Sequence, residues 1–342
     1  MKACFPPIPP WLAGRKIYLG AMRRIRQLAD KLAPLVLENH TGVPATGLND
    51  RCPLNVCVLA AYDPQGTIAD YVRYYIGCLR QAGFEIMYST TAPVIRPADL
   101  YYLREHCFRV VRRRNVGLDF CGYQEGIRWL RQHALLPRIN RLLITNDSFY
   151  GPLHPLSNIL AQMDEGDGEI WALTDCYMFE YHLQSFFLVL KRQAIQSEWF
   201  EWFWRRVERL EDRVEIVKRY EVGLSTSALS FGFKLRAAFP YEALMPQIIQ
   251  ELSALGPAAR LPMKRPEEVI PYLLYWDVLL ALGCPILKRT AILAALHDGL
   301  SFQEIKSRIR CTTDFPLGFI EQHFRNRHAE ALEEHGDTSC RK

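Results

Sequence analysis

The sequence has no Cys-x-x-Cys pair and no histidines at zinc-finger spacing, although it holds ten cysteines in 342 residues. The absence argues against a structural zinc site, and the scattered cysteine positions argue against a disulfide framework. Several cysteines lie in apolar runs, such as Cys57 within residues 55–60, where cysteine behaves as a small hydrophobic side chain. We therefore expect a reducing compartment, the cytoplasm.

Long hydrophobic runs are also lacking. No stretch reaches about 18 uncharged apolar residues, so the sequence predicts no membrane-spanning helix. Prolines at positions 6, 7, 9 and 10, followed by Arg15 and Lys16, interrupt the first residues. This pattern is not that of a signal peptide, so we expect none.

The net charge is small: the chain has 42 basic and 37 acidic residues, which gives +5. Residues 1–50 hold seven Lys or Arg against three acidic residues, which leaves the rest of the chain close to neutral. We therefore expect no nucleic acid partner for the chain as a whole. The apolar share of 49% excludes intrinsic disorder and predicts a globular protein.

The first part of the chain is basic and amphipathic. From Trp11 to about Leu37, apolar residues recur at spacings of three and four with Arg and Lys between them, which predicts a helix. Two interpretations stay open: the helix packs on the main domain, or it makes peripheral contact with an anionic membrane. Residues 38–53 are rich in turn-forming residues and are expected to form a linker.

Strand-like and helix-like segments alternate from residue 54 onward. Apolar runs at 55–62, 84–89, 107–111, 141–145 and 169–173 predict strands, and the segments at 66–82, 97–105 and 119–133 predict helices, the first with Thr67 as its N-cap. Alternation of this kind is typical of βαβ units and predicts an α/β fold with a mostly parallel twisted sheet flanked by helices.

The later part of the chain is mostly helical. A strand at 184–191 and a helix at 197–209 precede helices expected near 241–254, 270–282, 288–298, 301–309 and 316–328. We therefore expect four parts: the basic helix and linker at 1–53, the α/β domain at 54–240, a helical C-terminal extension at 241–330 and a polar tail at 331–342.

Chemistry is expected just after the strands, because ligands of parallel sheets bind beyond the carboxyl ends of the strands. The first candidate block runs from Arg112 to Tyr123, where Asp119 can cap a helix, Gly117 allows close backbone approach and three arginines can meet a phosphate. The alternative is an ordinary turn with a solvated basic patch.

The second block follows the strand at 141–145. Asn146, Asp147 and Ser148 place one carboxylate and two further oxygen ligands at a strand end. Such oxygen ligands suit a divalent cation, Mg²⁺ or Mn²⁺, that bridges two phosphate oxygens. The alternative is an Asn-Asp turn before Gly151.

Two further blocks offer acid–base and hydrogen-bonding groups. One of them holds a carboxylate as a general base and partners for sugar hydroxyls, namely Asp175, Glu180, His182, Gln184 and Ser185. A lone histidine such as His182 is more often structural. The other block is Tyr220-Glu-Val-Gly-Leu-Ser, where Glu221 either binds substrate or only begins a helix.

These four blocks, in this order, resemble the rhamnan synthesis protein F family over residues 55–289. The matching segments are Arg114-Asn-Val-Gly-Leu-Asp-Phe, Thr145-Asn-Asp-Ser-Phe-Tyr-Gly-Pro-Leu, His182-Leu-Gln-Ser-Phe-Phe, Tyr220-Glu-Val-Gly-Leu-Ser and Cys284-Pro-Ile-Leu-Lys-Arg. The resemblance implies a GT-A-like glycosyltransferase of bacterial cell-surface polysaccharide synthesis, such as that of the lipopolysaccharide O-antigen.

The resemblance also implies substrates and residue roles. The donor would be a nucleotide sugar, most plausibly dTDP-L-rhamnose, and the acceptor a lipid-linked glycan at the cytoplasmic face of the inner membrane. Asn115, Gly117 and Asp119 would line the nucleotide side, and Asn146, Asp147 and Ser148 would stand where GT-A enzymes bind metal, with Asp147 as the ligand. The base would be Asp175, with Glu180 and Glu221 in reserve; His182, Gln184 and Ser185 would bind substrate.

Two other functional classes stay open. A GT-A scaffold without catalysis would serve as a glycan-binding or assembly subunit, consistent with the single carboxylate at 146–148. A helix-turn-helix DNA-binding unit at 288–326 would use 300–309 as its first helix and 315–327 as its recognition helix. The second class is less favoured, because base-contacting helices carry several Arg, Lys, Asn or Gln, whereas residues 315–322 are mostly apolar.

Overall fold

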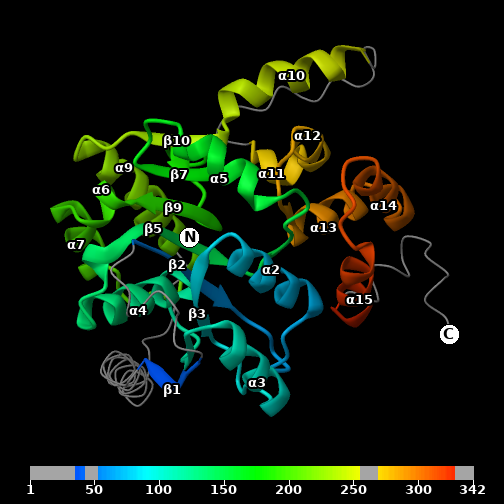
Figure 1. Cartoon of the computed structure of the whole chain (residues 1–342). Helices are drawn as coiled ribbons and strands as arrows, with labels where there is room; N and C mark the ends of the chain where they lie inside the picture. The colour runs from blue at the N-terminus through cyan, green and yellow to red at the C-terminus, as the bar shows by residue number, and fades with distance from the viewer. Residues whose placement is uncertain (1–34, 43–52, 255–268, 328–342) are drawn as a thin grey trace, which may run out of the picture.

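A computed structural model describes residues 35–42, 53–254 and 269–327 of the chain (Figure 1). A nine-stranded sheet forms its centre, with the strand order β1-β4-β3-β2-β5-β9-β7-β10 and β8 paired to β7. The strands are β1 (Val36–Thr41), β2 (Leu54–Ala61), β3 (Phe84–Thr90), β4 (Arg109–Arg113), β5 (Ile139–Asn146), β7 (Ile170–Cys176), β8 (His182–Leu183), β9 (Phe187–Lys191) and β10 (Leu235–Phe239).

Six of the nine strands of this sheet point the same way, and only β1, β8 and β9 run opposite to them. Strands β4, β3, β2 and β5 pair in parallel, as do β7 and β10. Strand β9 lies antiparallel between β5 and β7, so β5 and β7 point the same way. The predicted α/β class, a mostly parallel sheet flanked by helices, is confirmed.

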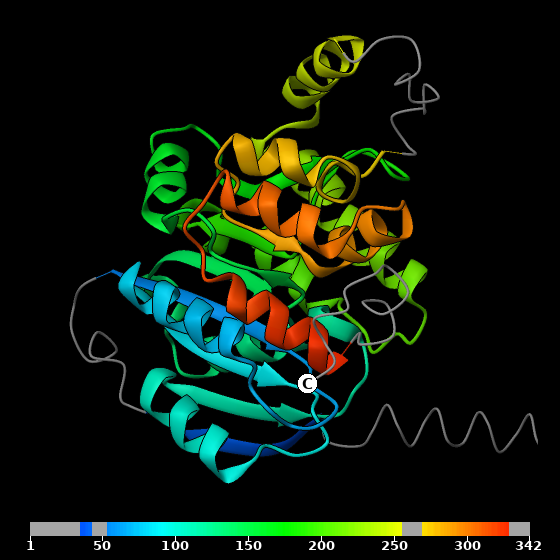
Figure 2. The same ribbon diagram turned by 90° about the vertical axis from the view of Figure 1, so that its right-hand side faces the viewer.

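Helices cover both faces of the sheet (Figures 1 and 2). One face carries α2 (Asp70–Gln81), α3 (Pro97–His106), α5 (Leu156–Asp164) and the C-terminal helices; the other carries α4 (Leu118–Gln132), α6 (Arg192–Ile195), α7 (Glu198–Arg205) and α9 (Gly223–Ser230). Strand β2 shows why two cores form. Cys57 and Leu59 pack in the first core, whereas Val56 and Val58 pack in the second, because successive side chains point to opposite faces.

The remaining elements connect or extend these layers. A short 3-10 helix (Leu136–Arg138) precedes β5, and α8 (Arg213–Ile216) leads into a π-helix (Val217–Val222) before α9. Helix α10 (Tyr241–Ala254) projects from the sheet at the top of Figure 1. The C-terminal elements are α11 (Pro271–Leu274), α12 (Trp276–Ala281), β11 (Leu287–Lys288), α13 (Arg289–His297), α14 (Phe302–Arg310) and α15 (Leu317–Arg327). The predicted helical C-terminal extension is therefore present.

The expected linker at 38–53 is wrong in its first residues. Residues 38–41 belong to β1, which pairs antiparallel with β4 at the edge of the sheet. Glu38 accepts a hydrogen bond from Arg112 Nε at 2.8 Å, so charged side chains fasten this edge strand. Its polar sequence, with alternate side chains exposed, hid the strand from pattern analysis. The predicted helix at 11–37 lies outside the described residues except for residues 35–37, and the last two of these are in β1.

The predicted N-cap at Thr67 is also wrong. Helix α2 begins at Asp70, and its N-cap residue makes no side-chain hydrogen bond. Thr67 Oγ1 instead donates to Asp63 Oδ1 at 3.1 Å, and the same oxygen accepts the backbone N–H of Gln65 at 2.8 Å. The Asp63 carboxylate organises a turn after β2, and this delays the helix.

The C-terminal helix α15 packs on α2 (Figure 2). The rings of Tyr74 and Phe315 lie 5.4 Å apart, those of Tyr71 and His323 lie 5.0 Å apart, and Arg327 pairs with Asp63 in the turn after β2. The apolar face of the supposed recognition helix is therefore buried within the molecule, which does not favour the helix-turn-helix alternative.

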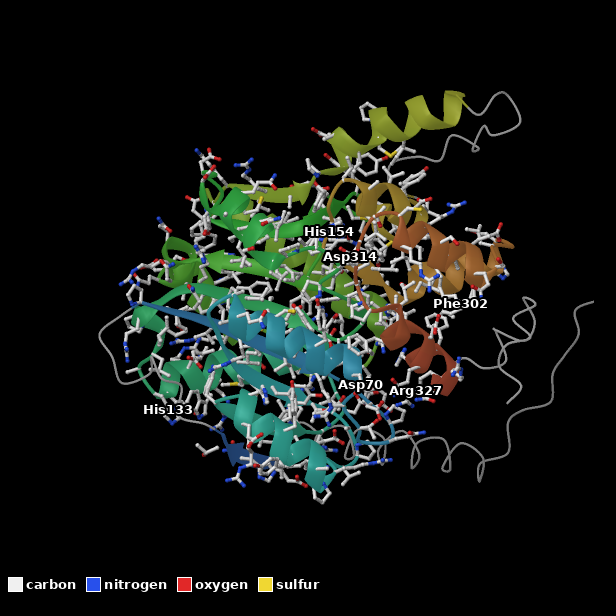
Figure 3. The ribbon with its side chains drawn as sticks, turned by 45° about the vertical axis from the view of Figure 1, so that its right-hand side comes forward. Asp70, His133, His154, Phe302, Asp314 and Arg327 are labelled. Atoms are coloured by element: carbon white, nitrogen blue, oxygen red, sulfur yellow. The ribbon has the colours of Figure 1, made fainter. Side chains whose placement is uncertain are left out.

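Two cavities lie where the C-terminal segment meets the sheet domain. One, of about 550 Å³, has His154 and Asp314 in its wall, and the other, of about 300 Å³, has Asp70 and Arg327 in its wall (Figure 3). Asp63 also lines the second cavity, which places that cavity next to the carboxyl end of β2.

The described residues also bear on membranes and thiols. No helix among them is long and apolar enough to span a bilayer. The cysteines within the described ranges are free thiols, and most of them are buried, as expected for small hydrophobic side chains.

Candidate functional site

Asp147 is fixed between the carboxyl ends of β2 and β5. Its backbone N–H donates to Ala60 O at 3.2 Å, and its Oδ2 accepts the backbone N–H of Tyr62 at 3.1 Å. The hydroxyl of Tyr71 on α2 donates to the Asp147 carbonyl at 3.0 Å. The side chain is only 13% exposed, so strand pairing and α2 together hold this carboxylate at the sheet edge.

Asn146 links the loop that holds Asp147 to the start of α4. Its Nδ2 donates to Asp119 Oδ2 at 2.8 Å, and its Oδ1 accepts the Ser148 hydroxyl at 2.6 Å and the Ser148 N–H at 3.1 Å. The structure therefore brings together Asp119, Asn146 and Ser148, residues that the sequence placed in two separate blocks.

The start of α4 differs from the prediction that Asp119 caps it. The N-cap residue is Gly117, with no side-chain cap, and Asp119 lies in the first turn. Gly117 has a φ of 66°, and a Cβ there would lie 2.0 Å from Cys121 Sγ, so glycine is required by both conformation and space. Asp119 is thereby free to face Asn146, while Asn115 is exposed to solvent on the loop before it.

Arg113 holds the loop before α4 in place. Its guanidinium is buried and donates to the carbonyls of Val116, at 2.8 Å, and Leu118. A Cβ on Gly122 would meet that guanidinium at 3.2 Å, which explains the second glycine of this block. Arg113 is therefore a structural cation that also attracts Asp119.

Lys288 and Arg289 were missed as site residues. Strand β11 pairs antiparallel with β6 (Phe149–Tyr150), and this brings Lys288 beside Phe149. The Lys288 ammonium donates to Ser148 Oγ and lies 4.5 Å from the centre of the Phe186 ring. The available signal was the Cys284–Arg289 segment, which the resemblance included but which no local motif marks as functional.

Arg289 faces Asp147 directly. Its Nη2 is 3.9 Å from Asp147 Oδ1, and its Nη1 donates to the Tyr71 hydroxyl at 3.1 Å. The Arg289 backbone N–H also donates to Ser148 O at 3.2 Å. A segment about 140 residues later in the chain thus adds two cations to the carboxylates at the end of β5.

Burial controls the protonation of these groups. Burial raises the pKa of Asp147 to about 6, against the opposing attraction of Arg289, and burial also raises the pKa of Asp119. Burial lowers the pKa of Lys288 to about 8, although Asp119 and Glu221 favour its charged form. Opposite charges therefore coexist here in a weakly hydrated environment.

Glu221 joins the same site from the π-helix. Its Oε1 accepts both the backbone N–H of Ser185, at 2.7 Å, and the Ser185 hydroxyl, at 2.8 Å. Glu221 also acts electrostatically on Asp119 and Lys288. Single π-turns of this kind are frequent at functional sites. The alternative that Glu221 only begins a helix does not hold, because Glu221 lies inside the π-helix and α9 begins two residues later, at Gly223.

Asp175 lies at the end of β7 and contacts other residues than Asp147 does. It is 4% exposed, and its Oδ1 accepts the backbone N–H of Tyr241 at 2.6 Å. Burial raises its pKa to about 6, and Glu242 and His182 also act on it electrostatically. The structure thus places Asp175 in a second cluster, separate from the hydrogen bonds around Asp147.

Glu180, His182 and Gln184 have structural contacts. Glu180 is exposed, and its carbonyl accepts the His182 Nδ1–H at 2.9 Å. His182 is fully buried, and its Nε2 has no hydrogen-bond partner within the described ranges. Gln184 Oε1 accepts the Thr174 hydroxyl at 2.6 Å. Of the three predicted substrate-binding residues, Ser185 is the one whose side chain hydrogen-bonds to Glu221 in the described part of the chain.

The donor set around Asp147 does not fit a divalent cation held by the protein. Within residues 35–42, 53–254 and 269–327, no group of three or more His, Cys, Asp or Glu side chains is placed to hold a metal. Asp147 and Asp119 already accept hydrogen bonds, and the cations Lys288 and Arg289 face them. The positive charges of Lys288 and Arg289 offset those carboxylates, so little negative charge remains to attract a divalent cation.

The comparisons with known proteins identify the family. The family model of rhamnan synthesis protein F matches residues 93–334, which is more than half of the chain. The chain therefore belongs to the rhamnan synthesis protein F family. The match begins later than the resemblance seen in the sequence and runs through the C-terminal helices to include α13, α14 and α15.

Individual relatives are more distant. The chain is 22% identical over 195 residues to the uncharacterized protein y4gN of Sinorhizobium fredii, covering 56% of this chain and 50% of that one. It is 26% identical over 147 residues to virulence protein VirA of Vibrio anguillarum, covering 42% and 47%. The chain thus spans about half the length of the curated relatives it matches.

Solved structures show only a distant likeness. A galactosyltransferase, LgtC, in complex with donor and acceptor sugar analogs has a TM-score of 0.31 and 15% identity, with 79% of this chain and 99% of that one covered. A 4-diphosphocytidyl-2C-methyl-D-erythritol synthase has a TM-score of 0.33 and 10% identity, with 63% and 95% covered.

Proposed function

We propose that the protein is a glycosyltransferase of polysaccharide synthesis with a GT-A-like donor site. The observation that carries the proposal is the convergence of Asp119, Asn146, Ser148 and Lys288 at the carboxyl ends of parallel strands. This edge is where α/β sheets bind their ligands. Membership of the rhamnan synthesis protein F family supports the same reaction class.

The site chemistry suits a nucleotide sugar. The ammonium of Lys288 and the guanidinium of Arg289 are matched to an anionic diphosphate, which favours two adjacent cations. The hydroxyls of Ser148 and Ser185 and the carboxylate of Asp119 are partners for sugar hydroxyls. One site thus offers charge for the leaving group and hydrogen bonds for the sugar.

The base that accepts the proton of the acceptor hydroxyl is proposed to be Asp175. With a pKa of about 6 it is ionised at neutral pH yet more basic than an ordinary aspartate. Glu221 is the first reserve, because it lies within electrostatic reach of Asp119 and Lys288. Glu180 is the second reserve, and its exposure makes it the weaker choice.

The finer substrate proposal is dTDP-L-rhamnose as donor and a lipid-linked glycan as acceptor, at the cytoplasmic face of the inner membrane. The basic excess of residues 1–50 suits peripheral contact with anionic lipid. Because β1 begins at Val36, a deletion of residues 1–34 tests this contact without removing an edge strand. We expect the deletion to abolish binding to anionic vesicles and to leave nucleotide binding intact. Unchanged vesicle binding would contradict the membrane role.

The test of the reaction is transfer by the purified protein from a panel of nucleotide sugars to lipid-linked acceptors. Asp119→Asn and Asp175→Asn should each lower kcat by about 100-fold or more, because positioned polar and acid–base groups contribute on that order. Asp167→Asn is the matched control, since Asp167 is an exposed partner of Lys234. Full activity in both site variants would refute the assignment of these residues.

The catalytically inactive scaffold is the second candidate. The engagement of Asp119 and Asp147 in hydrogen bonds within the protein is the observation that favours it. Tight nucleotide binding without turnover on any acceptor would support this candidate and contradict the enzyme proposal. The DNA-binding alternative would need a salt-dependent shift on duplex DNA, and we expect none.

A further inference from the structure

The position of Lys288 is unusual for a lysine. Its side chain is 8% exposed, and its ammonium lies 4.5 Å from the ring centre of Phe186 and 5.6 Å from that of Tyr272. Aromatic faces attract a cation but replace little of its hydration. The hydroxyl of Ser148 supplies one hydrogen bond, whereas an ammonium has three donors. Lys288 therefore retains hydrogen-bonding capacity toward the site.

Negative groups surround this ammonium. Asp119, Glu221 and Asp147 each act on Lys288 electrostatically. The same carboxylates are also balanced by Arg289, which faces Asp147, and by Arg113, which attracts Asp119. Three carboxylates and three basic side chains thus share the end of β5, and an added divalent cation would find little unbalanced negative charge.

The same surroundings favour the binding of a diphosphate. The diphosphate brings phosphate oxygens to a place where Lys288 has donors that Ser148 does not use and where burial disfavours the charged form of the lysine. Charge-assisted hydrogen bonds from lysine to phosphate are strong in such weakly hydrated surroundings. The same group that is costly to bury in the free protein is therefore stabilised when the anion binds.

We infer that Lys288, assisted by Arg289, holds the diphosphate of the donor and neutralises it as it departs, so that donor binding needs no divalent cation. The inference rests on the proposed function, because it concerns the same donor site. Lys288 and Arg289, both in the C-terminal segment, then supply the positive charge that the sequence analysis expected from a metal ion bound by Asp147.

Sugar transfer breaks one bond and forms another. The bond from the anomeric carbon of the sugar to the terminal phosphate oxygen breaks, and its electron pair leaves with that oxygen as the nucleoside diphosphate. The acceptor hydroxyl oxygen forms the new bond to the anomeric carbon, and its proton passes to a carboxylate base. Lys288 donates a hydrogen bond to the departing phosphate oxygen and remains protonated.

The test is calorimetric titration of the full chain with dTDP, UDP and GDP, in EDTA and in excess Mg²⁺. We expect at least one nucleotide to bind in EDTA with an affinity within about threefold of that in Mg²⁺. Lys288→Met should weaken it about 10- to 100-fold, the range for a lost charge-assisted hydrogen bond, and Lys288→Arg should restore most of it. Lys306→Met is the matched control: Lys306 is also 8% exposed, but pairs with Glu321 on α15.

The outcomes separate this inference from the proposed function. Binding that occurs only with Mg²⁺ would overturn the role of Lys288 and leave the nucleotide-sugar site standing. Absence of binding for every nucleotide in both buffers would overturn the proposed function itself. The comparison in EDTA uses the unmodified protein, so it decides the question even if Lys288→Met fails to fold. Equal losses in Lys288→Met and Lys306→Met would also overturn the inference.

Discussion

Asn146 Nδ2 donates to Asp119 Oδ2 at 2.8 Å, and this bond joins the end of β5 to the first turn of α4. Asn146 is the last residue of β5 and Asp119 comes after β4, and both strands belong to the parallel part of the sheet. Because the carboxyl ends of parallel strands meet at one edge, the fold itself brings the two residues together. The bond also supplies a partner for the half-buried carboxylate of Asp119.

Loss of that bond should cost stability. Asn146→Ala leaves Asp119 without its amide partner and should lower the free energy of unfolding by about 1–3 kcal/mol. Asn146→Asp should be at least as destabilising at neutral pH, because two carboxylates would then face each other. Urea unfolding of the three proteins measures both effects. An Asn146→Asp variant as stable as the wild type at pH 7.5 would contradict this account of the contact.

Asp175 should make stability depend on pH. Burial raises its pKa from 3.8 to about 6, so the folded protein holds this proton more tightly than the unfolded chain does. The stability that the protonated group contributes is therefore present below about pH 4 and is lost as the pH rises through about 6. Asp175→Asn removes this titration while it keeps an oxygen that can accept the Tyr241 N–H.

The difference between the variant and the wild type isolates this one group. We expect the free energy of unfolding of Asp175→Asn, relative to the wild type, to rise between pH 4 and pH 7 by up to about 3 kcal/mol. Urea titrations at several pH values measure it. A difference that falls with pH over this range would show that the carboxylate is stabilised in the folded protein, contrary to its buried position.

Substitutions of Glu221 should distinguish the structural role of its side chain from a functional role of its charge. Glu221→Gln keeps an oxygen for the Ser185 N–H and hydroxyl, so its unfolding free energy should stay within about 1 kcal/mol of the wild type. Glu221→Ala removes both bonds and should lose about 1–3 kcal/mol. If the negative charge serves the site, nucleotide or acceptor affinity should change in both variants. Unfolding curves that rank Gln below Ala would contradict the contact.

The contact of Arg327 with Asp63 should couple α15 to the sheet edge. Both side chains are about one-fifth exposed, so the pair is partly shielded from solvent. A double-mutant cycle with Arg327→Met and Asp63→Asn should give a coupling energy of about 1 kcal/mol or more, since shielding raises the value above that of exposed pairs. A coupling energy near zero would indicate that the packing of α15 on α2 holds the helix without this pair.

The sheet could be predicted because its signals are local. Strands β2, β3, β5 and β7 are rich in apolar residues and buried at most positions, which is the pattern of strands covered on both faces. The helices between them show helical spacing of apolar residues. Strand β1 could not be found this way, because it is short, polar and stabilised by pairing with β4 and by Glu38 contacting Arg112.

The site could be predicted only in part, for a related reason. Asp119, Asn146, Asp147 and Ser148 follow strands, so their positions in the sequence already placed them at one edge. Lys288 reaches the same edge through the pairing of the two-residue strands β11 and β6, which no sequence period announces. The contact of Gln184 with Thr174 could not be predicted either, because it arises only when the folded chain brings the two residues together.

The most direct test of the central claim is thermal unfolding of the purified chain with a panel of nucleoside diphosphates and nucleotide sugars. A ligand that binds only the native state stabilises it, by about 2.7 kcal/mol at a concentration about 100 times Kd. We expect Tm to rise for at least one nucleotide sugar, dTDP-L-rhamnose first among them. The rise should fall to about half or less in Lys288→Met, whose affinity is about 10- to 100-fold weaker, and should persist in full in Lys306→Met. A Tm unchanged by every nucleotide would contradict the donor site.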